Sequence, residues 1–146
     1  MQLDPLMYEK DLYEKGYSLI AGTDEAGRGP LCGPVVASAV ILPKNYHLEG
    51  LTDSKKLTEK QREKLFPIIM QDAISVGISI VDNEKIDEIN ILEASRYAMK
   101  EAISKLEVKP DYILTDAMDL YVDNCLPIIK GDLKSTTIAA ASVIAK

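Results

Sequence analysis

The sequence predicts an α/β fold in which helices cover one central sheet. Short apolar runs of strand length alternate with longer stretches whose apolar residues recur every three or four positions. Gly and Pro residues separate several of these segments. Hydrophobic residues make up 47% of the 146 positions, enough for one core, and no shift in composition marks a second domain. We therefore expect a single domain over residues 1–146.

The first part of the chain contains an expected helix and two expected strands. Residues 1–16 combine mixed charge with a weak helical spacing of apolar residues, and we expect a short helix without a role in function. The apolar runs 17–24 and 35–42 flank a Gly-rich corner and are typical of neighbouring strands. The first strand is expected to end at Asp24.

The middle of the chain predicts a helix followed by a third strand. Thr58 and Gln61 have the spacing of a capping box, which marks the start of a helix. Pro67 stands inside this helical pattern and should kink or end it. Residues 73–81 alternate apolar with small or polar residues, as a half-buried strand does.

The second half continues the alternation of helix and strand. A long helix is expected to begin at Asn90 and to be closed by Pro110. Residues 112–116 and 126–130 are apolar runs of strand length. The element order therefore predicts a sheet with connecting helices.

Residues 136–146 form an expected helix that is apolar nearly all round. Only Ser142 is polar between residues 138 and 145, so this helix requires neighbours on several sides. No Gly, Pro or polar signal for a helix end follows Lys146. We expect that a C-terminal segment absent from this sequence covers the helix.

Charge and composition exclude several classes of function. The chain has 17 Lys and Arg against 23 Asp and Glu, a formal net charge of −6. This balance argues against sequence-blind attraction to phosphate backbones, so any contact with nucleic acid must be local. No apolar run is long enough for a signal peptide or a membrane span. We expect a soluble, cytoplasmic protein with no membrane partner.

The Cys and His residues point away from zinc and from nucleophilic triads. Cys32 and Cys125 are not part of a Cys-x-x-Cys motif, and His47 is the single histidine. A zinc site and a triad that needs a catalytic His are therefore not expected.

Acidic residues stand where apolar runs stop, namely Asp24 with Glu25, then Asp116, then Asp132. In open α/β sheets, ligands collect beyond the strand ends, so these segments are expected to meet there. Each Asp taken alone is explained as a turn residue, and only the joint occurrence favours a site. Several converging carboxylates need a cation, and four suit a pair of Mg²⁺ ions roughly 3.5–4 Å apart.

Asp24 and Glu25 add one condition to this hypothesis. Side chains of adjacent strand residues point to opposite faces of a sheet. Both acids can serve one site only if the chain leaves strand geometry there. The Gly-rich residues 26–30 are expected to provide that departure.

Five segments of the sequence resemble the bacterial type 2 ribonucleases H, ribonuclease HII. They read GTDEAGRGP at 22–30, GPVVA at 33–37, DSKKL at 53–57, KGD at 130–132 and AAASVIAK at 139–146. The resemblance covers residues 17–146 in order. The Gly-Arg-Gly element at 27–29 also separates type 2 from the related ribonuclease HIII.

The resemblance implies a ribonuclease H-like fold, with a mixed five-stranded sheet and helices on both faces. It implies cleavage of the RNA strand of RNA–DNA hybrids and incision 5′ of single ribonucleotides in duplex DNA, leaving 3′-hydroxyl and 5′-phosphate ends. Two Mg²⁺ or Mn²⁺ ions per active site are implied. The catalytic, metal-binding acids of the family fall on Asp24, Glu25, Asp116 and Asp132.

The resemblance also implies substrate contacts. The backbone of the Gly-Arg-Gly element in the family reads the ribose 2′-hydroxyl, the group that distinguishes RNA from DNA. Phosphate contacts are expected from the Asp-Ser-Lys motif and from the segment near Asp132. The implied substrate-binding residues are Gly27, Arg28, Gly29, Lys55, Lys130 and Ser135.

Members of this family continue past the point that matches Lys146, with a helical tail that contacts substrate. We expect that this sequence lacks the tail and that the protein is a monomer. An alternative is a catalytically silent core that binds metal and, weakly, nucleic acid. A second alternative is another phosphoryl-transfer enzyme on the same fold, such as a 3′–5′ exonuclease.

Overall fold

The structure is a computed structural model that describes residues 4–26, 34–51, 58–82 and 90–145, apart from the side chains of residues 91, 132 and 133. Its centre is a five-stranded sheet in the order β3-β2-β1-β4-β5. The strands are β1 (Ile20–Ala26), β2 (Val35–Ile41), β3 (Ser75–Val81), β4 (Tyr112–Asp116) and β5 (Cys125–Ile128). The first three pair antiparallel, and β4 and β5 join them in parallel. The predicted mixed sheet is confirmed.

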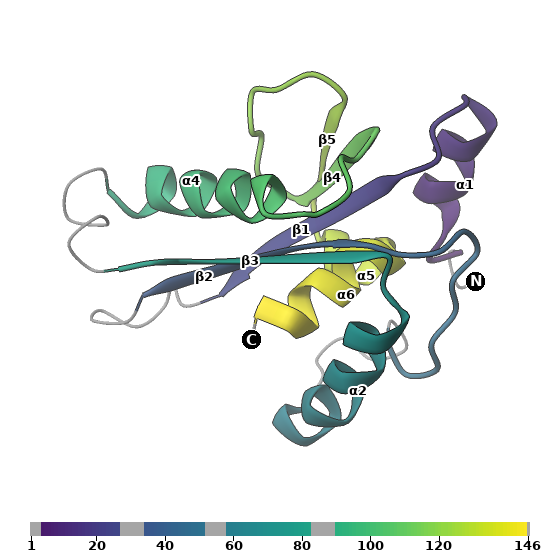
Figure 1. Ribbon diagram of the computed structural model, residues 1–146, viewed down its shortest axis with the longest axis horizontal. Coiled ribbons are helices and arrows are strands. Elements are labelled where there is room, and N and C mark those ends of the chain that lie inside the picture. Colours follow the sequence, from purple (N-terminus) through teal and green to yellow (C-terminus); the bar gives the residue numbers. More distant parts are fainter. Residues whose placement is uncertain (1–3, 27–33, 52–57, 83–89, 146) are drawn as a thin grey trace.

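Helices cover both faces of this sheet (Figure 1). They are α1 (Met7–Glu14), α2 (Glu59–Asp72), α4 (Ile91–Ser104), α5 (Gly131–Lys134) and α6 (Thr136–Ala145). α4 packs on one face, and α6 packs on the other, against β1 and β2. α2 lies below α6 in this view, and α1 lies at the end of the sheet where β1 begins.

Local signals explain where several helices begin. The Thr58 hydroxyl accepts the N–H of Gln61 at 3.1 Å, and the Gln61 side chain accepts the N–H of Thr58 at 2.7 Å, so the predicted capping box is confirmed. The Asn90 side chain accepts the N–H of Glu93 at the start of α4. The prediction that the second helix could end at Pro67 is wrong, because α2 continues to Asp72. Ile69, two positions after the proline, is fully buried, and this packing holds the last turns of α2 in place.

All ten residues of α6 are buried. Val40 and Ile69 belong to the same apolar cluster as the second half of α6, and Leu12 and Leu114 pack with Ile138 near its start. The expected neighbours on several sides are therefore confirmed. The expectation that a segment absent from this sequence must cover the helix is wrong for these ten residues, because the sheet, α1, α2 and α5 already do so.

The Tyr46 hydroxyl ties the segment after β2 to the end of α2 by donating to Asp72 at 2.7 Å. Burial, followed by this hydrogen bond, raises the pKa of Tyr46 to about 12. Because the pKa in the folded state exceeds the ordinary value of 10.0, the stabilisation is fully present below pH 10 and is lost as the pH rises through about 12.

We expect Tyr46→Phe to lower the free energy of unfolding by about 1 kcal/mol at pH 7, the usual net value of one hydrogen bond. Urea unfolding of both proteins at pH 7 and at several values above pH 10 measures the difference. The difference should shrink at the higher values, because the variant cannot ionise at this position. A difference that is constant from pH 7 upward would contradict the assignment.

Candidate active site

Two of the predicted acids lie near the ends of adjacent parallel strands, Asp24 within β1 and Asp116 as the last residue of β4. β1 and β4 pair from Ile20 opposite Tyr112 to Thr23 opposite Thr115, and Asp24 and Asp116 are the next residues on the two strands. Since paired parallel strands are about 4.8 Å apart and matching positions share a face, the two carboxylates project to the same side of the sheet.

That side is the face covered by α6. Alternation puts Gly22 on the same face as Asp24, and a Cβ added to Gly22 would lie 2.5 Å from the carbonyl carbon of Thr137. The Asp24 side chain is nearly buried, with 6% exposure, and Asp116 is half-buried. Two carboxylates so close together in a poorly solvated place repel each other, and a divalent cation between them would offset that cost. The donor set therefore fits a hard metal ion.

The segment that carries Asp132 is attached directly to Asp116. The N–H of Gly131 donates to Oδ1 of Asp116 at 3.1 Å. A Cβ added to Gly131 would lie 3.4 Å from the Cα of Asp116, so the two backbones are close. Asp132 is the next residue, in the short helix α5, and its side chain lies outside the described part of the structure. The backbone thus brings the positions of Asp24, Asp116 and Asp132 together.

Glu25 is placed differently from the expectation. β1 continues in regular pairing through Glu25, opposite Ala37, to Ala26, opposite Val36. The strand thus extends past Asp24, where it was expected to end, and Ala26 shows no departure from strand geometry, while residues 27–30 lie outside the described residues. Alternation directs the Glu25 side chain to the face opposite that of Asp24. Glu25 is 9% exposed, and its backbone N–H donates to Oδ1 of Asp24 at 2.8 Å.

In the described residues, no three His, Cys, Asp or Glu side chains form a group that could hold a metal ion. This result agrees with the alternation of β1, which directs Asp24 and Glu25 to opposite faces. The four-carboxylate site stays a prediction that also involves the Asp132 side chain.

The predicted substrate contacts fall into three cases. Gly27, Arg28, Gly29 and Lys55 lie outside the described residues. Lys130 is exposed and precedes α5, with a left-handed backbone at φ 56°. Ser135 is fully buried, and its hydroxyl donates to Glu9 at 2.9 Å, which favours a structural role over contact with substrate.

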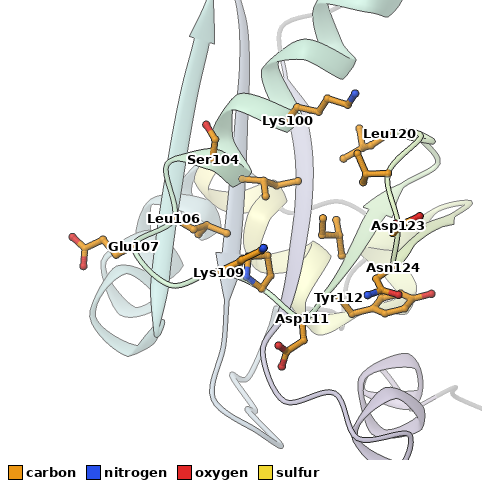
Figure 2. Close-up of a pocket in the computed structure, with 14 residues that line it drawn as sticks. Lys100, Ser104, Leu106, Glu107, Lys109, Asp111, Tyr112, Leu120, Asp123 and Asn124 are labelled. Atoms are coloured by element: carbon orange, nitrogen blue, oxygen red, sulfur yellow. The ribbon is translucent and has the colours of Figure 1, made fainter.

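A separate pocket lies at the other end of β4. It measures about 670 Å³ and is lined by the end of α4 and the residues around Tyr112 and Asn124 (Figure 2). Asp111 lines it, and its carboxylate accepts the N–H groups of Ser18 and Leu19, which lowers the pKa of Asp111. This pocket is separate from the acidic strand ends.

Sequence reasoning missed Glu9, which is fully buried in the first turn of α1. The available signal was its spacing, because Glu9 lies three positions before Leu12 on the face that α1 buries. A carboxylate at a buried position is rare enough to require a partner. The segment at Ser135–Thr137 supplies that partner.

The mixed sheet and its covering helices place this protein in the class with a ribonuclease H-like fold, and comparison with solved structures agrees. Ribonuclease H2 from Pyrococcus horikoshii superimposes with a TM-score of 0.75 at 31% identity, over 87% of this chain and 70% of that one. Ribonuclease HII from Archaeoglobus fulgidus, solved in a complex with PCNA, gives 0.73 at 30% identity over the same shares. Bst ribonuclease HIII in complex with Mn²⁺ shares the fold, with a TM-score of 0.69 at 19% identity over 91% of this chain and 52% of that one.

Sequence comparison defines the family. The profile of the Ribonuclease HII family matches residues 21–146. Ribonuclease HII of Acetivibrio thermocellus is 59% identical over 99% of this chain and 57% of the relative. Ribonuclease HII of Acholeplasma laidlawii is 56% identical over 100% of this chain and 72% of the relative. This chain therefore belongs to the ribonuclease HII family and spans 57% and 72% of the lengths of these two relatives.

No helix in the described part of the chain is both long and apolar enough to span a bilayer.

Proposed function

We propose that this chain is the core of an endoribonuclease that cleaves the RNA strand of RNA–DNA hybrids and cuts duplex DNA on the 5′ side of a single ribonucleotide. The observation that supports this most strongly is that Asp24 and Asp116 directly follow the last paired residues of β1 and β4, with the N–H of Gly131 bound to Asp116. Membership of the ribonuclease HII family supports the substrate class.

The residues have distinct roles in this proposal. Asp24, Asp116 and Asp132 would hold two Mg²⁺ or Mn²⁺ ions, together with Glu25 if its side chain turns toward the site. When bound, the ions would lower the pKa of an attacking water and offset charge on the leaving 3′-oxygen. The N–H of Gly131 donates to Oδ1 of Asp116 and so links this carboxylate to the segment that carries Asp132.

Substrate selection would depend on other segments. The backbone of Gly27, Arg28 and Gly29 would contact the ribose 2′-hydroxyl, which is absent from DNA. Lys55 and the exposed Lys130 would contact phosphates. Ser135 is left out of this set because its hydroxyl is bound within the protein. Such local contacts are compatible with a net charge of −6.

A cleavage assay tests the proposal. The substrates are a DNA duplex with one ribonucleotide, labelled at the 5′ end of that strand, and the same duplex without it. Two proteins are compared in Mg²⁺ and in Mn²⁺: this chain, and this chain extended by the part of the Acetivibrio relative that the match does not cover. We expect one internal cut, 5′ of the ribonucleotide, with a 3′-hydroxyl end.

Each result of this assay has a defined meaning. Cutting by the extended protein alone would support the alternative that the 146-residue chain is a silent core. A ladder of products shortened from one end would favour the exonuclease alternative. No internal cut by the extended protein in either metal would contradict the proposed function.

A further inference from the structure

The first turn of α6 receives its hydrogen-bond partners from the N-terminal segment of the chain. The first N–H groups of a helix have no partner within the helix, and a buried helix start must find them elsewhere. The N–H of Thr136 donates to the carbonyl oxygen of Pro5 at 2.9 Å, and the N–H of Thr137 donates to Oε2 of Glu9 at 3.0 Å. The N–H of Ile138 donates to the Ser135 hydroxyl at 3.2 Å.

Glu9 makes more of these contacts than any other residue at this helix start. Its Oε2 also accepts the hydroxyl groups of Thr137 at 2.8 Å and of Ser135 at 2.9 Å. The interacting residues are 126 to 128 positions apart in the sequence. A carboxylate at a helix N-terminus is also favoured by the helix dipole. Glu9 therefore caps α6 from a different helix.

Burial at this position carries an electrostatic cost. Desolvation raises the pKa of the Glu9 carboxyl, and the hydrogen bonds from Thr137 and Ser135 oppose that effect. Within the described residues, the other carboxylate oxygen, Oε1, has no hydrogen-bond partner. If Glu9 served only to pack α1 against the sheet, an apolar side chain such as that of the neighbouring Leu12 would do so without the desolvation cost of a carboxylate. The specific feature that Glu9 adds is the fixed position of residues 135–137.

Those residues directly follow the helix that carries Asp132. α5 ends at Lys134, and its first N–H, that of Gly131, donates to Asp116. The segment 131–137 is thus fixed at one end by Asp116 and at the other by Glu9. Asp132 lies between these two attachments.

We propose that Glu9 is a positioning residue for the active site, which holds the Asp132 segment at a fixed place relative to Asp24 and Asp116. This inference rests on the proposed function, in which those three acids bind metal. It gives the N-terminal helix a role that the sequence did not predict.

The test uses amide hydrogen exchange and Mn²⁺ binding in the 146-residue chain. Glu9→Ala removes the acceptor for three hydrogen bonds, and Glu9→Gln keeps one acceptor oxygen and most of the volume. Glu14→Ala and Glu14→Gln are matched controls, because Glu14 is exposed at the other end of α1. Amides of α4 report global stability on the opposite face of the sheet.

We expect Glu9→Ala to speed exchange of the Gly131 and Thr137 amides by at least about tenfold more than that of α4 amides. We also expect it to weaken the binding of Mn²⁺ alone, followed by calorimetry, by about tenfold, as loss of an outer-shell partner does. Glu9→Gln should show smaller changes in the same direction. The Glu14 variants should match the unmodified chain in both measurements.

Exchange that rises equally at Gly131 and in α4 would show a merely structural role and overturn the inference. So would altered exchange at Gly131 with unchanged Mn²⁺ affinity. If Glu9→Ala does not fold, Glu9→Gln decides the question, and equality with Glu14→Gln overturns the inference. An unmodified chain that binds no Mn²⁺ would contradict the proposed function, while the exchange data still report whether Glu9 fixes the segment.

Discussion

Asp116→Asn is expected to reduce cleavage of a ribonucleotide-containing duplex by at least about a hundredfold, the usual cost of losing one preorganised electrostatic group. The substitution removes one of the two negative charges that directly follow the last paired residues of β1 and β4. It preserves the shape of the side chain and the oxygen that accepts the N–H of Gly131. The backbone around Asp132 should therefore stay in place, and only the affinity for divalent ions should fall.

Two measurements separate this effect from loss of folding. Cleavage is followed in the extended protein used above, and Mn²⁺ binding and thermal unfolding are measured in the 146-residue chain. Asp111→Asn is the matched control, because Asp111 precedes the other end of β4 and contacts Ser18 and Leu19 instead. It should cleave within about twofold of the unmodified protein. Undiminished cleavage by Asp116→Asn would show that this carboxylate is not a metal ligand.

Gly22→Ala is expected to reduce the stability of the fold strongly. A Cβ at Gly22 would lie 2.5 Å from the carbonyl carbon of Thr137 and 2.6 Å from the backbone nitrogen of Ile138. Both atoms belong to the backbone at the start of α6, so no side-chain rotation relieves the overlap. We expect a loss of about 3 kcal/mol in the free energy of unfolding, the upper part of the range for overpacking. In a chain of this length, the midpoint of thermal unfolding should fall by about 10 °C.

The same substitution should disturb the candidate site, because the first turn of α6 can yield only by moving away from β1. Residues 135–137 would move with it, and so would the Asp132 segment. Gly77→Ala is the control, since a Cβ there would lie 2.0 Å from the carbonyl oxygen of Ala102 in α4, on the opposite face. Both variants should lose stability, but at a temperature where both are folded only Gly22→Ala should lose Mn²⁺ affinity. Equal affinities would contradict the proposed link between α6 and the metal site.

Local patterns in the sequence were sufficient for most of the fold. The capping box at Thr58 and the cap at Asn90 depend on residues three positions apart, and both are present in the structure. The acids at positions 24 and 116 follow apolar runs, and the structure places them directly after the last residues that pair β1 with β4. Pro67 shows the limit of such rules, because burial of Ile69 outweighs the backbone cost of a proline inside α2.

Local sequence patterns did not predict the directions of the acidic side chains in the candidate site. Whether Asp24 and Glu25 share a face depends on how far β1 remains paired, and pairing with β2 continues to Ala26. The sequence placed the departure directly after Glu25, because Gly residues follow there. Hydrogen bonding to a neighbouring strand, which no local pattern encodes, decides this point.

By itself, the sequence determined the α/β class and the family, and the family resemblance implied the mixed sheet and the four acidic positions. These follow from periodicity, turn residues and motifs, each of which involves residues close together in the chain. Only the tertiary structure decided that Gly131 contacts Asp116 and that Glu9 caps α6. It also decided that the backbone at the start of α6 packs directly against Gly22. The physical reason is that these contacts join residues up to 128 positions apart, whose approach is set by packing on the sheet.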